Sequence, residues 1–145
     1  MENSAEYVLA WEQFPLRTFD KIRYADTDRQ GHVNNACFAT YLETGRVEFL
    51  YDPKNELLVP ASSFVIASLQ LQLMAELHWP GTVEIGTGIR SIGNSSLKLY
   101  QQLFQAGKLV AKAETVIVQV SAATGKGLPF SDAARQQLEA FIIAL

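Results

Sequence analysis

The sequence predicts an α+β fold in which a curved antiparallel sheet of about five strands wraps around one long central helix. Apolar residues recur with the period of an α-helix once, between Asn34 and Tyr51. They then alternate with a period of two in four consecutive segments joined by short turns, which favours antiparallel pairing. One helix must cover the apolar face of that sheet, so we expect residues 1–145 to form a single domain.

The first expected strand covers Leu16–Tyr24, and a polar turn separates it from the long helix. Asn34 or Asn35 is the natural N-cap of this helix. One face of the helix carries a continuous stripe formed by Phe38, Tyr41, Leu42, Gly45 and Phe49. Glycine costs a helix about 0.5–1 kcal/mol relative to alanine, and close packing of this position against the sheet would offset that cost.

The alternating segments follow in order, and a second helix ends the chain. In the first of these strands, Leu69, Leu71, Leu73, Ala75 and Leu77 are expected to share the buried face. Ser131 is the expected N-cap of the final helix, which the pattern extends through Ala144. The four predicted strands are 68–79, 83–92, 97–104 and 109–120.

Composition excludes several classes of protein. The chain has 145 residues, 48% of them hydrophobic, a net charge of −3 and a pI of about 5.3. It shows no basic stripe of the kind that nucleic-acid-binding modules carry. Cys37 is the single cysteine, so no intramolecular disulfide can form. The start, MENSAEYVLAWEQF, lacks the basic region of a signal peptide, and no segment approaches the ~20 apolar residues of a membrane span. We therefore expect a cytoplasmic protein.

The stretch YADTDRQGHVNN, residues 24–35, holds several proton-handling and capping side chains just before the long helix. Asp26, Asp28, Gln30 and Gly31 match early positions of a calcium-binding EF-hand loop, but the position of its bidentate acid is Cys37. A zinc site needs several His or Cys ligands, and the chain offers only His32, His78 and Cys37. We expect no metal and no cofactor, and we interpret His78, just before a Trp-Pro-Gly run, as a turn residue.

A nucleophilic serine is not indicated, because the sequence has no G-x-S-x-G motif and Ser95 and Ser96 lie in a hairpin turn. Cys37, in the first turn of the helix, is either an activated thiol or a buried small side chain. Asp28 lies where the free N–H groups of a helix start can stabilise an oxyanion, so a carboxylate there suits acyl transfer. The alternative is that Asp26 or Asp28 only holds the turn together.

The motif RYADTDRQGHVNN, followed by Tyr41-Leu42-Glu43 and Arg46, resembles the 4-hydroxybenzoyl-CoA thioesterase-like family of the hotdog fold. The resemblance continues through RSIGNSSLKLYQQLFQAGKLVAKAETVIVQV to TGKGLPF. It implies hydrolysis of acyl-CoA thioesters by a homodimer or homotetramer, with acyl-CoA as the small-molecule partner. It also implies that Asp28 acts as general base or nucleophile and that the backbone N–H at Asn35 polarises the carbonyl.

The His-Val-Asn-Asn run also resembles acyl-ACP thioesterases, which implies functional roles for Gln30 and His32. Phe38 stands where many relatives have tyrosine. The candidate catalytic residues are thus Asp28, His32 and Asn35. The candidate substrate-binding residues are Gln30, Gly31, Ser95, Ser96, Arg90 and Lys98, the last two as partners of CoA phosphates.

Two other functions stay open from the sequence. One is hydrolysis of acyl-ACP, although the acidic balance of the chain suits an acidic carrier poorly. The other is a hotdog protein that binds acyl-CoA or serves as a scaffold without turnover. A homo-oligomer is also expected because one helix leaves the second sheet face and a sheet edge uncovered.

Overall fold

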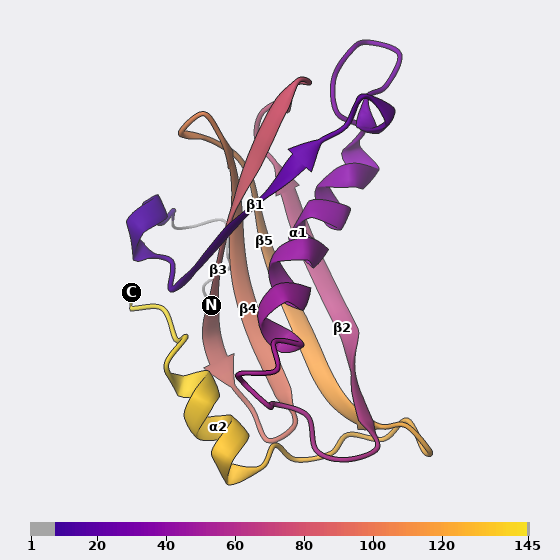
Figure 1. Ribbon diagram of the computed structural model, residues 1–145, viewed down its shortest axis with the longest axis vertical. Coiled ribbons are helices and arrows are strands. Elements are labelled where there is room, and N and C mark those ends of the chain that lie inside the picture. The colour runs from indigo at the N-terminus through magenta and orange to yellow at the C-terminus, as the bar shows by residue number, and fades with distance from the viewer. Residues whose placement is uncertain (1–7, 145) are drawn as a thin grey trace.

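One antiparallel sheet organises residues 8–144, the part of the chain that the computed structural model describes (Figure 1). Its strands lie in the order β1-β3-β4-β5-β2. They are β1 (Leu16–Ile22), β2 (Ser62–Leu73), β3 (Gly81–Ile92), β4 (Ser96–Gln105) and β5 (Lys108–Ser121). The long helix α1 (Asn35–Leu50) and the short helix α2 (Asp132–Glu139) complete the α+β architecture, so the predicted hotdog fold is confirmed.

The expectation about a signal peptide concerns the start of the chain, whose residues 1–7 lie outside the part that the structure describes. Among residues 8–144, neither helix has the length and apolar character needed to cross a membrane.

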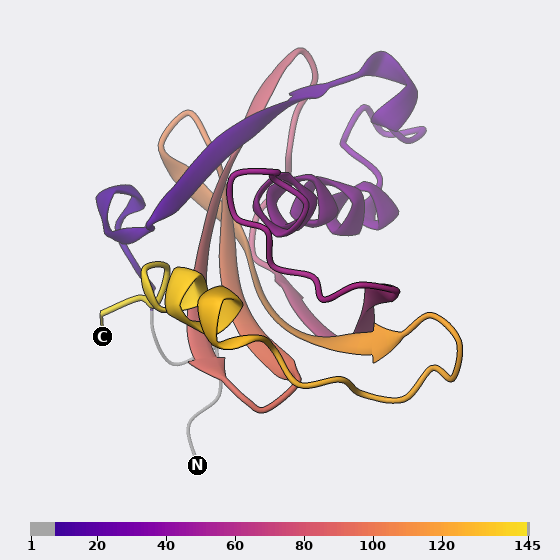
Figure 2. The ribbon, with the colours of Figure 1, turned by 60° about the horizontal axis from the view of Figure 1, so that its bottom comes forward.

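The sheet curves around α1, which Figure 2 shows almost end-on. The predicted stripe is buried: Phe38, Tyr41 and Leu42 pack against Ile85 and Leu103 of the sheet. Gly45 lies so close to the sheet that a Cβ atom there would be 2.6 Å from Ile85 Cγ2 and 2.9 Å from Gln101 Nε2. The prediction that close packing explains this glycine is confirmed.

The far end of α1 packs with α2, which lies where β3 turns into β4 (Figure 1). Phe49 and Leu50 of α1 share this cluster with Leu138 of α2 and Ile89 of β3. Ser131 caps α2 by accepting a hydrogen bond from the Ala134 N–H at 3.0 Å, as predicted.

The other face of β3 and β4 is partly covered by the chain's own ends. The short 3-10 turn η2 (Trp11–Gln13) lies in the segment that delivers Phe14 onto this face. The cluster there consists of Leu9, Phe14, Tyr100, Phe104 and Ile143. We expected this whole face to need cover from a partner subunit. The two terminal segments of the same chain bury part of it.

The predicted strand 68–79 was wrong in its bounds, since β2 begins at Ser62 and ends at Leu73. Leu69 and Leu73, which were expected on its buried face, are 38% and 45% exposed. The Met74 and Ala75 N–H groups both donate to the Val110 carbonyl, at 2.9 and 3.1 Å, so the regular ladder stops there. The Leu77 carbonyl accepts instead from the Val33 N–H at 3.0 Å. Alternation of side chains continues through this segment, but its backbone bonds turn to the loop before α1.

The final helix was also predicted too long, because α2 ends at Glu139 and not at Ala144. Beyond β1, the edge of β3 offers backbone groups to the chain's last residues. The Ile89 N–H donates to the Phe141 carbonyl at 2.8 Å, and the Ile143 N–H donates to the Ile89 carbonyl at 2.9 Å. Pairing with this edge replaces the last helical turn.

Candidate active site

Asp26 anchors the polar loop that precedes α1. It lies in the 3-10 turn η3 (Tyr24–Asp26), and its carboxylate is buried. The Arg23 N–H and the Tyr41 hydroxyl donate to Oδ2 at 3.0 and 2.8 Å, and Arg23 Nη2 donates to Oδ1 at 2.9 Å. The Asp26 carbonyl accepts from the Asn34 N–H at 2.8 Å. Asp26 therefore connects the loop to the start of α1. This agrees with the alternative that Asp26 holds the turn together.

These contacts set the charge state of Asp26. Burial by itself would raise the pKa of this carboxyl, but the hydrogen bonds from Arg23 and Tyr41 outweigh it and the pKa lies below its usual value. Burial and the Asp26 carboxylate together raise the pKa of the Tyr41 hydroxyl, so Tyr41 stays a donor.

We expect Asp26→Asn to lower the free energy of unfolding by about 1–3 kcal/mol at neutral pH, because Tyr41 and Arg23 lose a charged acceptor. The folded-state pKa of Asp26 is lowered, so its contribution is complete above the unfolded-state pKa of about 3.9. It disappears as the pH falls through the lower folded-state pKa. Urea unfolding should be measured from neutral to acidic pH. The free energies of unfolding of the wild type and Asp26→Asn should differ most at neutral pH and become more similar in acid.

Asp28→Asn is the matched control for that measurement, since it removes an exposed carboxylate from the same loop. We expect this control to unfold like the wild type across the pH range. Equal stability of Asp26→Asn and wild type at neutral pH would contradict the anchoring role.

Asp28 closes the tip of the loop. Its Oδ1 accepts the N–H groups of Gln30 and His32 at 2.9 and 3.2 Å, and its own N–H donates to the His32 carbonyl at 2.7 Å. Gly31 takes a φ of +83°, which favours glycine, and no atom lies within 4 Å of a Cβ built there. Gly31 is thus explained by the positive φ that the turn requires and not by a lack of space for a side chain. Asp28 is exposed, and among the described residues nothing donates to its Oδ2.

The start of α1 provides a free N–H donor. Asn34 is the N-cap, and its side chain accepts from the Ala36 N–H at 2.9 Å. The Cys37 N–H donates to the Asn34 carbonyl at 2.9 Å. Within residues 8–144, no acceptor binds the N–H of Asn35, the first residue of the helix. This is the donor that the family resemblance assigned to the carbonyl oxygen.

Asp28, Gln30, His32 and Asn35 line one open cleft of about 450 Å³. Phe38, Leu73 and Met74 supply apolar surface in the same cleft. The structure therefore brings the three candidate catalytic residues together with Gln30, one of the candidate substrate-binding residues. A carboxylate, an imidazole and a free helix-terminal N–H beside apolar surface form the set of groups that hydrolysis of an acyl compound needs.

Cys37 is poorly suited to be the nucleophile. Its Sγ lies 3.7 Å from the Asp26 carbonyl, toward which the thiol donates. Burial raises the pKa of this thiol, and the nearby Asp26 carboxylate adds to the effect. The thiol is therefore held protonated, which favours the interpretation of Cys37 as a packed small side chain over that of an activated thiol.

The other candidate substrate-binding residues do not join this cleft within one chain. Ser95 and Ser96 lie at the β3–β4 turn, at the end of the sheet opposite the start of α1 (Figure 1). Their carbonyls accept from the Gln119 N–H at 2.8 Å and the Gly93 N–H at 2.7 Å. Arg90 and Lys98 lie 3.3 and 3.9 Å from carboxylate oxygens of Glu114. The Glu114 carboxylate thus offsets part of the positive charge of Arg90 and Lys98, which were expected to bind CoA phosphates.

Glu76 also lines the cleft, although no motif of the sequence indicated it. Its Oε2 lies 3.2 Å from His32 Nε2 and 3.7 Å from His78 Nε2. His78 was interpreted as a turn residue, and the sequence carries no local signal that links it to His32. Their proximity depends on the backbone contact between the loop before α1 and the segment after β2.

A family model described as the thioesterase-like superfamily matches residues 22–138. The chain belongs to this superfamily. It is 28% identical over 112 residues to the acyl-CoA thioester hydrolase YbgC of Shigella flexneri, covering 74% of this chain and 81% of that protein. The membership and these relatives confirm the predicted class of thioester hydrolases.

Solved structures agree with this membership. A predicted thioesterase from Bacillus stearothermophilus superimposes with a TM-score of 0.81 at 30% identity, covering 90% of this chain and 98% of that one. A thioesterase from Thermus thermophilus, solved with coenzyme A and Zn, gives a TM-score of 0.76 at 27% identity and covers 90% of this chain and 96% of the other.

Proposed function

We propose that this protein hydrolyses acyl-CoA thioesters to a free acid and CoA. The observation that carries the proposal is the pairing, in one cleft, of the Asp28 carboxylate with the free Asn35 N–H at the start of α1. The acyl-CoA specificity is supported by the name of the YbgC relative and by the CoA bound in the Thermus thermophilus structure.

In this proposal the thioester oxygen accepts the Asn35 N–H, and the positive end of the α1 dipole stabilises the oxyanion as it forms. The acyl chain contacts the apolar surface of Phe38 and Leu73. The main-chain bonds at Asn34 and Val33 fix the position of this N–H before substrate arrives.

Asp28 supplies the second half of the reaction, as general base or as nucleophile. As a base, Oδ2 takes a proton from water while the water oxygen bonds to the carbonyl carbon. Collapse of the intermediate breaks the C–S bond, and the leaving CoA thiolate takes up a proton. As a nucleophile, Asp28 Oδ2 bonds to the carbonyl carbon, and the C–S bond breaks so that CoA leaves as a thiolate, which takes up a proton. The resulting anhydride is then hydrolysed by water, which frees the acid and restores the Asp28 carboxylate. His32, on the rim of the cleft, orients water or carries the proton in either route.

We also propose a homodimer through the exposed edge of β2. Val65, Ile66, Leu69 and Leu73 are exposed apolar side chains on this edge strand, and an uncovered edge of this kind favours pairing with a second chain. Ser96 pairs with Val118, which pairs with Val65 on β2. Ser96 therefore lies at the Val65 end of the sheet, and Leu73 lies at the other end of β2, beside the cleft. Antiparallel pairing of two β2 strands would bring the Val65 end of one subunit close to the cleft of the other. The β3–β4 turn with Ser95, Ser96, Arg90 and Lys98 would thereby serve the neighbouring site.

The dimer can be tested by Leu69→Lys, which puts a charge on the paired edge. We expect this variant to be a monomer by light scattering after size exclusion, with the wild type a dimer or larger. Phe19→Lys is the control, because Phe19 is also exposed and lies on β1, at the other edge of the sheet. A monomeric wild type, or a Leu69→Lys protein that stays dimeric, would contradict this interface.

The proposed function is tested by thiol release from a panel of short, long and aromatic acyl-CoAs, with matched acyl-ACP substrates measured beside them. We expect turnover of at least one acyl-CoA and weaker turnover of the corresponding acyl-ACP. Saturable binding of acyl-CoA without thiol release would favour a binding or scaffolding role. Turnover confined to acyl-ACP would replace the CoA assignment.

A further inference from the structure

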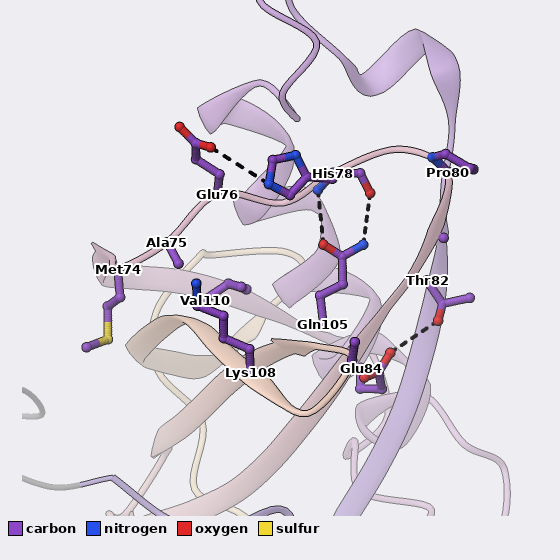
Figure 3. A pocket seen from close by; sticks show the side chains of 12 residues that line it. Met74, Ala75, Glu76, His78, Pro80, Thr82, Glu84, Gln105, Lys108 and Val110 are labelled. Atoms are coloured by element: carbon purple, nitrogen blue, oxygen red, sulfur yellow. Dashed lines mark hydrogen bonds and ion pairs between the residues drawn. The ribbon is translucent and has the colours of Figure 1, made fainter.

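Two histidines and one carboxylate from distant parts of the chain converge beside the cleft. The metal-ligating atoms of His32, Glu76 and His78 all lie within 4.8 Å of one another. Glu76 Oε2 stands between the two imidazoles, 3.2 Å from His32 Nε2 and 3.7 Å from His78 Nε2. Figure 3 shows Glu76 and His78 directed toward each other at the rim of the neighbouring pocket.

The backbone holds the two histidines opposite each other. His32 and His78 form an isolated antiparallel bridge, and the adjacent Val33 N–H donates to the Leu77 carbonyl at 3.0 Å. The His78 N–H and carbonyl are both bonded to the Gln105 side chain, at 3.0 and 2.8 Å (Figure 3). Directly opposed residues of an antiparallel pair have neighbouring side chains. The backbone bridge therefore places the two imidazoles side by side.

We propose that His32, Glu76 and His78 form a binding site for a divalent transition metal of the Zn²⁺ class. Ligand atoms about 2.0–2.2 Å from a tetrahedral Zn²⁺ lie about 3.3–3.6 Å from each other. The two distances to Glu76 Oε2 bracket this range. The side chains of His32, Glu76 and His78 are 31%, 60% and 58% exposed, so an ion can reach them and a small rotation of His78 can complete the site.

The donor set selects the metal. Two imidazoles with one carboxylate suit Zn²⁺, Cu²⁺ and Ni²⁺, whereas Mg²⁺ and Ca²⁺ prefer sites made of oxygen alone. Three protein ligands leave one tetrahedral position for water or an anion. The metal would also occupy the Nε2 lone pair of His32. If His32 handles a proton as proposed above, metal binding would slow thiol release, and this consequence alone rests on the proposed function.

The test is calorimetric titration of tag-free wild-type protein with ZnCl₂, in the absence of any substrate. We expect saturable binding of one Zn²⁺ per chain and no saturable binding of Mg²⁺. His78→Ala and Glu76→Gln should each weaken Zn²⁺ binding at least about tenfold, since each removes a direct ligand. Glu84→Gln is the matched control, because Glu84 lines the same pocket but bonds to Thr82 outside the cluster.

X-ray absorption at the zinc edge gives a second readout, which should show two imidazole ligands in the wild type and fewer in His78→Ala. Thermal melting without metal establishes that the variants are folded. The proposal is overturned if Zn²⁺ does not bind saturably, or if it binds equally well to the wild type, His78→Ala and Glu76→Gln. Because no substrate is present, failure of the thioesterase assignment would leave this result unaffected.

Discussion

The Asp28→Asn protein is expected to lose about 10²–10⁴-fold in kcat for acyl-CoA hydrolysis, the range that a positioned acid or base contributes. Asparagine keeps an Oδ1 atom that can accept the Gln30 and His32 N–H groups, so the loop geometry should persist. What disappears is the charge on the second oxygen, which either activates water or attacks the carbonyl. KM should change much less than kcat, because the carboxylate acts mainly in the transition state.

Steady-state thiol release with the best acyl-CoA of the panel measures this effect. Asp132→Asn is the matched control, since it removes a carboxylate from the first turn of α2, the helix that is not at the cleft. Asp28→Asn should melt at the wild-type temperature, which separates a chemical defect from an unfolded site. Turnover within about twofold of the wild type would exclude Asp28 as base and as nucleophile, because loss of either role costs far more than that.

Gly45→Val is expected to lower the free energy of unfolding by roughly 3–5 kcal/mol. Overpacking a core position costs about 1–3 kcal/mol, and the new side chain would collide with Ile85 and Gln101. Gln101 Nε2 donates to the Leu42 carbonyl and to Thr87 Oγ1, both at 3.0 Å, and each lost bond adds about 1 kcal/mol. Removing a helical glycine returns only a few tenths of a kcal/mol.

Urea unfolding of wild type, Gly45→Ala and Gly45→Val tests this packing. The alanine variant should fall between the other two, because its methyl group is smaller and alanine favours the helix. Thr40→Val, on the exposed side of α1, controls for a β-branched apolar residue in this helix and should stay within about 0.5 kcal/mol of the wild type. If Gly45→Val were as stable as the wild type, the close contact between α1 and the sheet would not hold.

The elements with strong periodicity were predictable from the sequence. The α1 stripe and the three strands β3, β4 and β5 follow from local patterns bounded by turns, and their bounds differ from prediction by few residues. The loop with Asp28 and Gly31 was predictable because Gly, Asp and Asn before an apolar helix mark both a turn and a helix cap. The same local chemistry places Asn35 at the helix start.

What the sequence did not reveal depends on contacts between distant segments. β2 was misplaced because an edge strand is exposed on both faces along much of its length, so its first half carries no alternation of buried and exposed residues. The end of α2 depends on backbone groups of β3 at Ile89. Glu76 and His78 join His32 only through the bridge between the two loops, which no local pattern encodes.

The most direct test of the proposed mechanism is a crystal structure of the Asp28→Asn protein with an unreacted acyl-CoA. We expect the thioester oxygen to lie about 2.7–3.1 Å from the Asn35 N atom. We also expect residue 28 to face the carbonyl carbon, directly or through one water. A thioester bound elsewhere on the chain, or bound with its carbonyl turned away from the start of α1, would show that this helix terminus and Asp28 do not form the active site.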